Sequence, residues 1–230
     1  MRAAATRLKR LVPLPARAYL RRREHELRCR RALRRGLRNL AERPRGSDEI
    51  WQDLIDGWDN KRWSASPEYL DAVAAAALAE EGPILECGSG LSTLVLATTA
   101  RGTGSEIWTL EHRLPSFRRI EACLHRFRLR ANVLWTPLRA FEEFDWYDVD
   151  PAQLPVVALV VCDGPPQATR GGRVGLVPVL QERLAPNACI LLDDAARPNE
   201  REVLARWASD TRLRYEFRGE ARQFAVVRLP

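Results

Sequence analysis

Short apolar segments alternate with longer amphipathic ones over residues 64–230, and this alternation limits the fold more than any other feature of the sequence. Five segments have the length and composition of strands: PILEC (83–87), EIWTLEH (106–112), ANVLWTP (131–137), PVVALVVCD (155–163) and ACILLDD (188–194). Around them the spacing predicts helices over 67–81, 91–100, 115–129, 175–185 and 199–210. Strands that alternate with helices of this length form βαβ units in a parallel sheet.

The last two apolar segments, LRYEFRG (213–219) and QFAVVRLP (223–230), are joined by only a few residues. So short a connection allows only antiparallel pairing. We therefore predict an α/β fold with a doubly wound, mostly parallel seven-stranded sheet and an antiparallel C-terminal hairpin.

Polar residues follow the predicted strands at their carboxyl ends, where open α/β sheets bind ligands. The first strand runs into a glycine turn within ILECGSGLST (84–93), and the second ends at Glu111 and His112. Gly88 and Gly90 allow the backbone to approach a ligand closely, while Ser92 and Thr93 open a helix whose free N–H groups favour an anion. An acid at the second strand end suits the two hydroxyls of a ribose. A turn without any ligand is the simpler alternative.

These segments resemble the cofactor motifs of class I S-adenosylmethionine-dependent methyltransferases. ILECGSGLST and WTLEH carry the resemblance, VVCDGPP and CILLDDA look like the fourth- and fifth-strand segments, and Ser92 replaces the third glycine of the usual pattern. The resemblance implies a Rossmann-like methyltransferase fold that binds S-adenosylmethionine. The cofactor-binding residues it implies are Glu86, Gly88, Ser89, Gly90, Ser92, Thr93, Glu111 and His112. A nicotinamide or flavin enzyme is the competing interpretation of the turn, but it would favour GxGxxG, and Thr93 stands at the third glycine position.

Three aspartates follow the two most apolar strands: Asp163, Asp193 and Asp194. Neighbouring carboxylates need a cation or a proton, and Mg²⁺ takes oxygen ligands of this type. The resemblance to metal-dependent O-methyltransferases implies that these three residues are metal-binding and catalytic, although DGPP departs from the catechol-type segment. One aspartate acting as a general base without a metal is a second possibility. Simple structural roles, such as a turn cap or a bond to Arg197, are a third.

The N-terminal 45 residues differ from the rest of the chain in charge. They contain 15 Arg and one Lys against three Glu, a net charge of +13, while residues 46–230 carry −6. Cys29, Leu33, Leu37 and Leu40 fall near helical spacing. We therefore divide the chain into a basic, partly helical arm (1–45) and a cofactor-binding domain (46–230), with the arm available to a membrane surface or an acidic partner.

The pattern of cysteines and histidines predicts no zinc site. Five cysteines are widely spaced without a CxxC pair, and the three histidines form no recognisable ligand spacing. Cys87, Cys162 and Cys189 lie in apolar segments, so we expect buried, reduced thiols in a cytoplasmic protein. Trp51, Trp58 and Trp63 could form a lid or a core staple, and we expect Arg170 and Arg173 to be solvated loop residues, with a grip on an anionic substrate as the alternative.

The combined prediction is methyl transfer from S-adenosylmethionine to a small molecule, at a hydroxyl oxygen. Two alternatives stay open: an inactive methyltransferase-like binding or scaffold protein, and a nucleic-acid methyltransferase guided by the basic arm. The negative charge of residues 46–230 and the lack of an NPPY-type segment argue against a nucleic acid in the pocket. The sequence leaves the acceptor and the oligomeric state undetermined.

Overall fold

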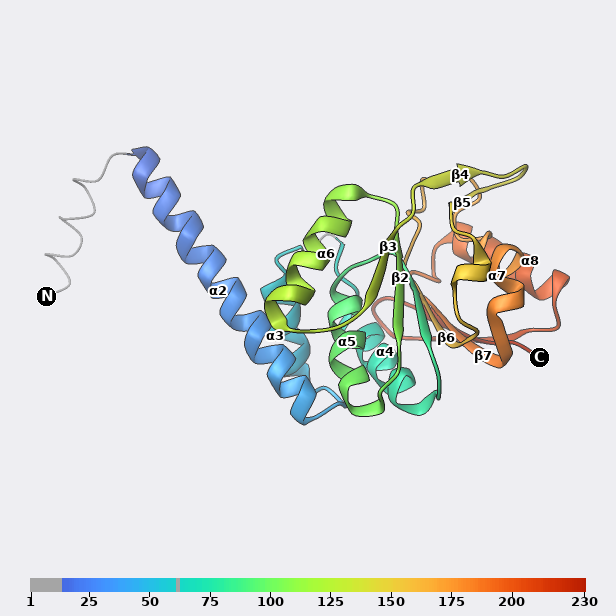
Figure 1. The fold of residues 1–230 in the computed structure, drawn as a ribbon, viewed down its shortest axis with the longest axis horizontal. Coiled ribbons are helices and arrows are strands. Elements are labelled where there is room, and N and C mark those ends of the chain that lie inside the picture. The colour runs from blue at the N-terminus through green and yellow to red at the C-terminus, as the bar shows by residue number, and fades with distance from the viewer. Residues whose placement is uncertain (1–13, 61–62) are drawn as a thin grey trace, which may run out of the picture.

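The computed structural model describes residues 14–60 and 63–230. A seven-stranded sheet lies at the centre of the folded domain (Figure 1). Its strand order is β3-β2-β1-β6-β7-β9-β8. The bounds are β1 (Ile84–Cys87), β2 (Ile107–Glu111), β3 (Asn132–Trp135), β6 (Val157–Cys162), β7 (Leu184–Leu192), β8 (Arg214–Arg218) and β9 (Phe224–Arg228). The first five strands in this order pair in parallel, and β9 is antiparallel to both β7 and β8. The predicted fold class is confirmed.

Helices cover both faces of this sheet (Figure 1). On one side lie α4 (Pro67–Ala79), α5 (Leu91–Thr103) and α6 (Leu114–Phe127), and on the other α7 (Leu176–Leu180) and α8 (Pro198–Asp210). Successive residues of β6 serve the two layers in turn: Leu159 and Val161 belong to the core with α4 and α5, while Val160 and Cys162 belong to the core with α7 and α8. Burial on both faces explains why β6 is apolar without interruption.

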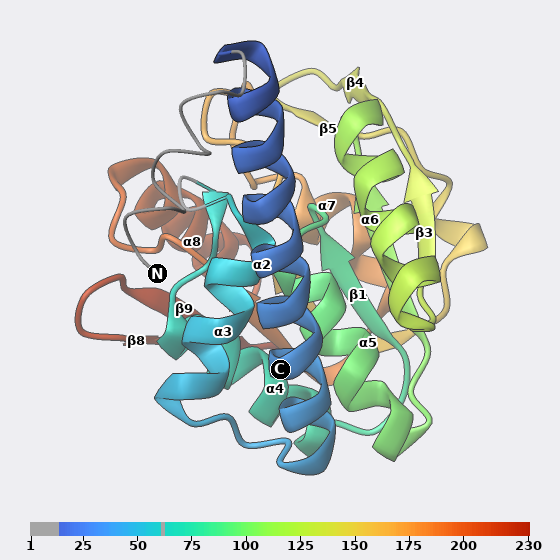
Figure 2. The same ribbon diagram turned by 90° about the vertical axis from the view of Figure 1, so that its left-hand side faces the viewer.

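Two further helices, α2 (Leu14–Glu42) and α3 (Asp48–Trp58), pack against each other and against the α5 side of the domain (Figure 2). In the last turns of α2, Leu33, Leu37 and Leu40 are buried in the hydrophobic core, as their helical spacing predicts. A Cβ on Gly57 of α3 would lie 2.3 Å from the backbone nitrogen of Leu33, so glycine permits this close approach. The earlier turns of α2 project away from the domain (Figure 1). The proposed boundary at residue 45 stays a prediction.

The glycine turn between β1 and α5 is set by a second close contact. Gly88 has φ +90°, and a Cβ there would lie 3.0 Å from the backbone nitrogen of Gly164. The loops after β1 and β6 are therefore packed backbone to backbone, which only a residue without a side chain allows. The start of α4 follows the sequence as well, since the Ser66 hydroxyl accepts a hydrogen bond from the Tyr69 N–H at 3.2 Å.

The structure departs from the predicted elements at one predicted helix and at several elements that were not predicted, among them α3. The helix expected over 175–185 is short, because α7 passes into a 3₁₀ turn, η3 (Gln181–Arg183), and β7 begins at Leu184, paired with Val157. A small hairpin, β4 (Leu138–Ala140) and β5 (Asp145–Tyr147), and a 3₁₀ turn, η2 (Pro151–Gln153), were not predicted. All five cysteines are free, with Cys87, Cys162 and Cys189 buried as expected. Among the described helices, none is long and apolar enough to cross a membrane.

Candidate functional site

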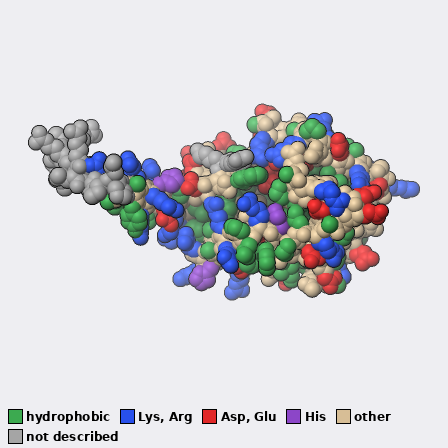
Figure 3. All heavy atoms as spheres, turned by 90° about the horizontal axis from the view of Figure 1, so that it is seen from above, with side chains coloured by type: hydrophobic (Ala, Val, Ile, Leu, Met, Phe, Trp, Pro, Cys, Tyr) green, Lys and Arg blue, Asp and Glu red, His purple; other side chains and the backbone are tan. Residues whose placement is uncertain are grey.

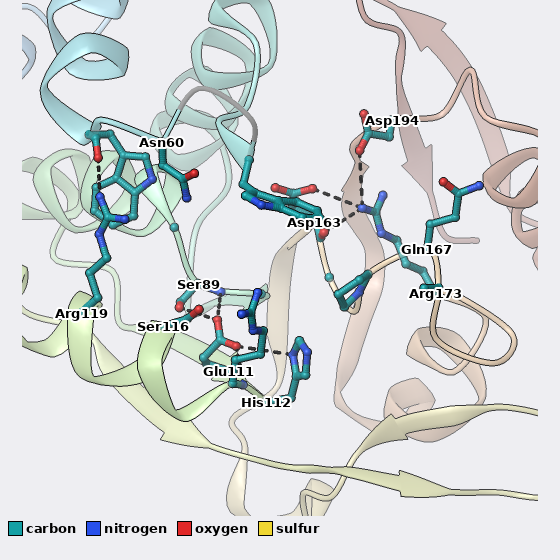
Figure 4. Close-up of a pocket in the computed structure, with 18 of the residues that line it drawn as sticks. Asn60, Ser89, Glu111, His112, Ser116, Arg119, Asp163, Gln167, Arg173 and Asp194 are labelled. Carbon is teal, nitrogen blue, oxygen red and sulfur yellow. Dashed lines mark hydrogen bonds and ion pairs between the residues drawn. The ribbon is translucent and has the colours of Figure 1, made fainter.

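A cavity of about 540 Å³ opens at the carboxyl ends of β1, β2, β6 and β7 (Figure 4). Seven of the residues predicted for cofactor binding or catalysis line it: Gly88, Ser89, Gly90, Glu111, His112, Asp163 and Asp194. They come from separate segments of the sequence, and the parallel strands bring their ends to one edge of the sheet. The cavity volume is within the range of small-molecule sites.

Glu111 is the centre of one side of the cavity. Its carboxylate accepts hydrogen bonds from the Ser89 N–H at 3.0 Å, the Ser89 hydroxyl at 2.6 Å and the Arg113 N–H at 2.7 Å. His112 lies beside it, with Nδ1 3.4 Å from Glu111 Oε1, and burial lowers the pKa of this imidazole. A neutral imidazole next to a fixed carboxylate forms a wall that suits a polar, uncharged group such as a ribose.

Glu86, Ser92 and Thr93 lie beneath this wall, outside the described lining of the cavity. The Thr93 hydroxyl donates to Glu86 at 2.6 Å and accepts from the Gly90 N–H at 2.9 Å. The Thr109 hydroxyl also donates to Glu86, at 2.9 Å, and burial raises the pKa of this carboxyl to about 7. These residues therefore hold the glycine turn in place from below, and their direct contact with a cofactor stays a prediction.

The three predicted aspartates meet on the opposite side. Asp163, Asp193 and Asp194 each bring a carboxylate oxygen within 4.8 Å of those of the other two. Burial, reinforced by the charge of Asp193, raises the pKa of Asp163 to about 7, and burial also raises the pKa of Asp193. Asp194 has φ +56° and donates its N–H to Asp193 Oδ1 at 2.8 Å, which turns the two neighbouring side chains toward one centre.

Three arginines surround this acidic cluster. The bond to Arg197 was predicted as a structural alternative, whereas the contacts with Arg173 and Arg222 were not. Arg173 Nη2 donates to Asp163 Oδ1 at 3.2 Å, Arg222 Nη2 to Asp194 Oδ1 at 2.8 Å, and Arg197 Nη1 lies 2.8 Å from Asp194 Oδ2. Arg173 also bonds the backbone carbonyls of Asp163 and Asp193. The expectation that Arg173 is solvated is therefore wrong: its side chain is only 2% exposed. Arg170 remains on the surface, paired with Asp145 at 2.9 Å.

The acidic cluster does not fit a magnesium ion in this arrangement. Mg²⁺ requires an octahedral set of oxygen atoms whose lone pairs point at the ion. Both oxygens of Asp194 and one oxygen of Asp163 already face guanidinium groups. An ion at the centre of the cluster would have to displace these cations, which supply the positive charge that the carboxylates need.

An aromatic segment forms a third part of the cavity wall. Trp58 ends α3 and is buried, and the Arg119 guanidinium lies 4.0 Å from the centre of its ring while donating to its backbone carbonyl. Trp51 is also buried, so these two tryptophans staple the core. Trp63 is different, because it is 59% exposed and lines the cavity. The core-staple prediction is confirmed for Trp51 and Trp58, and the lid role stays a prediction for Trp63.

Comparison with known proteins identifies the fold and leaves the family undefined. No protein-family model and no curated protein matches the sequence. Among solved structures, the chain is similar to cofactor-bound Rv0187 from MTB, with 19% identity and a TM-score of 0.59 over 78% of this chain and 87% of that one. It also resembles the O-methyltransferase from Bacillus cereus in complex with SAH, with 13% identity and a TM-score of 0.57 over 84% and 96%.

A third similar structure is the tRNA (m1A58) methyltransferase TrmI from Aquifex aeolicus, with 15% identity and a TM-score of 0.53 over 78% of this chain and 76% of that one. At these identities the likeness concerns the fold, which is that of class I methyltransferases. Because the fold carries an O-methyltransferase and a tRNA methyltransferase alike, the acceptor has to be argued from the site.

Proposed function

We propose that this chain transfers a methyl group from S-adenosylmethionine to a hydroxyl oxygen of a small-molecule acceptor. The observation that carries the proposal is the single cavity that joins the glycine turn and Glu111 to the acidic cluster. When bound, S-adenosylmethionine supplies an electrophilic methyl group on a positively charged sulfur. The fold supports this cofactor class, since two of the similar structures contain a bound cofactor or SAH.

The cofactor would be held by the β1 and β2 ends of the cavity. Gly88 and Gly90 present backbone there without side chains, and Glu111 presents a carboxylate that could accept hydrogen bonds from two ribose hydroxyls. The Ser89 hydroxyl occupies one oxygen of Glu111 in the described structure. We expect Ser89 to rotate away or to share this oxygen when the ribose is bound.

Asp163 is the group best placed to take the acceptor's proton. It lines the cavity, its side chain is 30% exposed, and its pKa of about 7 suits a general base at neutral pH. The Asp163 carboxylate would take the proton of the acceptor hydroxyl, whose oxygen would accept the methyl group that S-adenosylmethionine supplies as S-adenosylhomocysteine leaves. Arg173 holds Asp163 in place through both its carboxylate and its backbone carbonyl.

Mg²⁺ is the alternative source of acceptor activation, and we propose that the arginines take its place. Arg173, Arg197 and Arg222 already neutralise the carboxylates at which the ion would bind. Turnover that is equal in EDTA and in Mg²⁺ is the expected result. Turnover that requires Mg²⁺ would show that the arginines move aside for a metal.

The first test is calorimetric titration with S-adenosylmethionine and S-adenosylhomocysteine, with NADH as the control. We expect binding of the two sulfur compounds alone, and no binding of either would refute the proposal. An acceptor screen then compares wild type with Asp163→Asn and with Asp210→Asn, which removes an exposed carboxylate of α8. Loss of a general base lowers turnover by about 10²–10⁴-fold with cofactor affinity retained. Cofactor binding without turnover on any acceptor would favour the inactive scaffold.

The projecting half of α2 supports a separate proposal, contact with an anionic lipid surface. Residues 14–32 contain seven arginines against Glu24 and Glu26, and Tyr19, Leu20 and Leu27 are exposed among them. Figure 3 shows basic and hydrophobic side chains along this helix. Such a composition is typical of helices that bind anionic membrane surfaces. Residues 1–13, which belong to the same predicted arm, lie outside the described residues.

Vesicle sedimentation with and without phosphatidylserine tests this second proposal. Replacing Arg21, Arg22 and Arg23 with Gln should weaken binding by about 100-fold, at about 1 kcal/mol for each arginine. Deleting residues 1–45 is a poorer test, because it also removes Leu33, Leu37 and Leu40 from the core. If the triple variant bound vesicles as tightly as wild type, α2 would be excluded as the lipid-binding element. Binding to RNA but not to vesicles would instead favour the nucleic-acid alternative.

A further inference from the structure

His25, Cys29 and Asp59 form a compact group of metal-ligand side chains outside the cavity. His25 Nε2 lies 2.9 Å from Asp59 Oδ2 and 3.6 Å from Cys29 Sγ, and the three ligand atoms lie within 4.8 Å of one another. His25 and Cys29 stand one turn apart on α2, and Asp59 caps the end of α3 with φ 53°. From these contacts we propose that this group binds Zn²⁺ and thereby fastens α2 to α3.

Two of the three donor separations are close to those of a tetrahedral zinc site. With a Zn–S bond of about 2.3 Å and a Zn–N bond of about 2.0 Å, the sulfur and nitrogen ligands of such a site lie about 3.5 Å apart. The observed separation of Cys29 Sγ and His25 Nε2 is 3.6 Å. The corresponding separation of a nitrogen and an oxygen ligand is about 3.3 Å, so His25 and Asp59 need to part by only a few tenths of an ångström.

The composition of the group favours zinc over magnesium or calcium. Thiolate and imidazole are zinc ligands, whereas Mg²⁺ and Ca²⁺ are bound by oxygen atoms. The His25 and Asp59 side chains are 51% and 55% exposed, which leaves an entry path and room for a water as the fourth ligand. Asp56 adds negative charge near Cys29, and Arg28 adds positive charge.

Binding requires one proton to leave the site. Zinc binds a cysteine as its thiolate, so the Cys29 thiol must lose its proton. Zn²⁺ replaces that proton: the Zn–S bond forms, the thiol proton goes to the buffer, and the imidazole of His25 binds in its neutral form. The sequence pattern did not predict this site, because Asp59 lies 30 residues beyond Cys29 and only the packing of α2 on α3 brings them together.

The site adjoins the candidate functional cavity without sharing a residue with it. Asp59 is followed directly by Asn60, which lines the cavity, and it is preceded by Trp58, which lies under Arg119. A metal at Asp59 would therefore lie directly between Trp58 and Asn60, two residues of the cavity lining. This inference is independent of the proposed methyl transfer.

Calorimetric titration of the full-length, untagged, reduced chain with Zn²⁺ tests the proposal. We expect one tight equivalent, a buffer-dependent enthalpy that reports one released proton, and loss of that equivalent in Cys29→Ser and in His25→Ala. Cys123→Ser and His125→Ala are the matched controls, since Cys123 is the other thiol that is not buried and His125 is exposed on α6. Both controls should bind Zn²⁺ like wild type.

Cobalt substitution gives a second measurement, which reports the ligands and the geometry of the bound ion. Co²⁺ bound at this site should show a thiolate-to-cobalt charge-transfer band and the intense visible bands of tetrahedral coordination, both lost in Cys29→Ser. Asp163→Asn separates this site from the acidic cluster and should leave the spectrum unchanged. A tight equivalent that survives in Cys29→Ser, or disappears in Asp163→Asn, would overturn the proposal, as would the absence of any tight binding.

Discussion

The two sides of the cavity are stabilised by different chemistry. Around Glu111, one carboxylate is held by neutral donors, a hydroxyl and two backbone N–H groups. Around Asp163 and Asp194, carboxylates are held by three guanidinium groups, one of them fully enclosed. Neutral donors leave the first side able to exchange its bonds with a ligand, whereas charge pairing holds the carboxylates of the second side in fixed positions.

The largest expected effect comes from the second side. Arg173→Met would leave Asp163 and Glu200 without the cation that faces them in the interior. Removing one partner from a buried ion pair costs about 3–5 kcal/mol, because the remaining charge is desolvated and unpaired. Urea unfolding should show this loss in the free energy of unfolding.

Arg170→Met is the control for this comparison, because Arg170 is in the same segment but 46% exposed, paired with Asp145. Arg170 also donates to the backbone carbonyls of Phe141, Glu142 and Phe144, but water can replace its bonds at this partly exposed position, so its loss should cost less than the loss of Arg173. Equal destabilisation by both variants would contradict the view that the enclosed ion pairs of Arg173 are a main support of the second side.

The difference in burial between Arg173 and Arg170 could not be predicted from the sequence. Each predicted strand was a continuous apolar segment between turn residues, so local composition was enough to find it. The aspartates were found because they directly follow β6 and β7. Of their arginine partners, the sequence suggested only Arg197. Arg222 comes from the loop between β8 and β9 and Arg173 from a glycine-rich turn, and nothing local distinguishes a buried arginine from a solvated one.

The prediction of a helix over the whole of 175–185 was wrong for a similar reason, because a distant contact decided the structure. Its apolar residues fit helical spacing, but Leu184 is drawn into the sheet by its pairing with Val157. A contact with a residue far away in the sequence thus overrides the local pattern. The same limit hid the His25, Cys29 and Asp59 group, whose members lie on two helices.

Glu111→Gln tests whether the first side of the cavity binds the cofactor. The substitution replaces an anionic acceptor with an amide that can accept at only one atom. Hydrogen bonds to a charged group contribute about 1.5–3 kcal/mol, so the Kd for S-adenosylmethionine should rise about 10- to 100-fold. Glu106→Gln removes an exposed carboxylate just before β2 and should leave the Kd unchanged in the same calorimetric titration. Cofactor affinity that is equal in the two variants would remove Glu111 from the binding site.

The smallest expected effect is a shift in the pH dependence of turnover. The charge of Asp193 helps to raise the pKa of Asp163 to about 7, and a general base acts in its deprotonated form. Wild-type turnover should therefore rise with pH and level off above about 7. In Asp193→Asn the pKa of Asp163 falls because a neighbouring negative charge is gone, so the rise moves to lower pH.

Arg222→Met provides the opposite test, since the guanidinium of Arg222 lowers the pKa of Asp163. Its profile should move to higher pH, with both variants reaching a plateau where Asp163 is ionised. Opposite displacements from two substitutions that both disturb the same cluster cannot arise from loss of folding, which would lower turnover at every pH. Profiles that stay in place would instead mean that the acidic side of the cavity holds the acceptor without taking its proton.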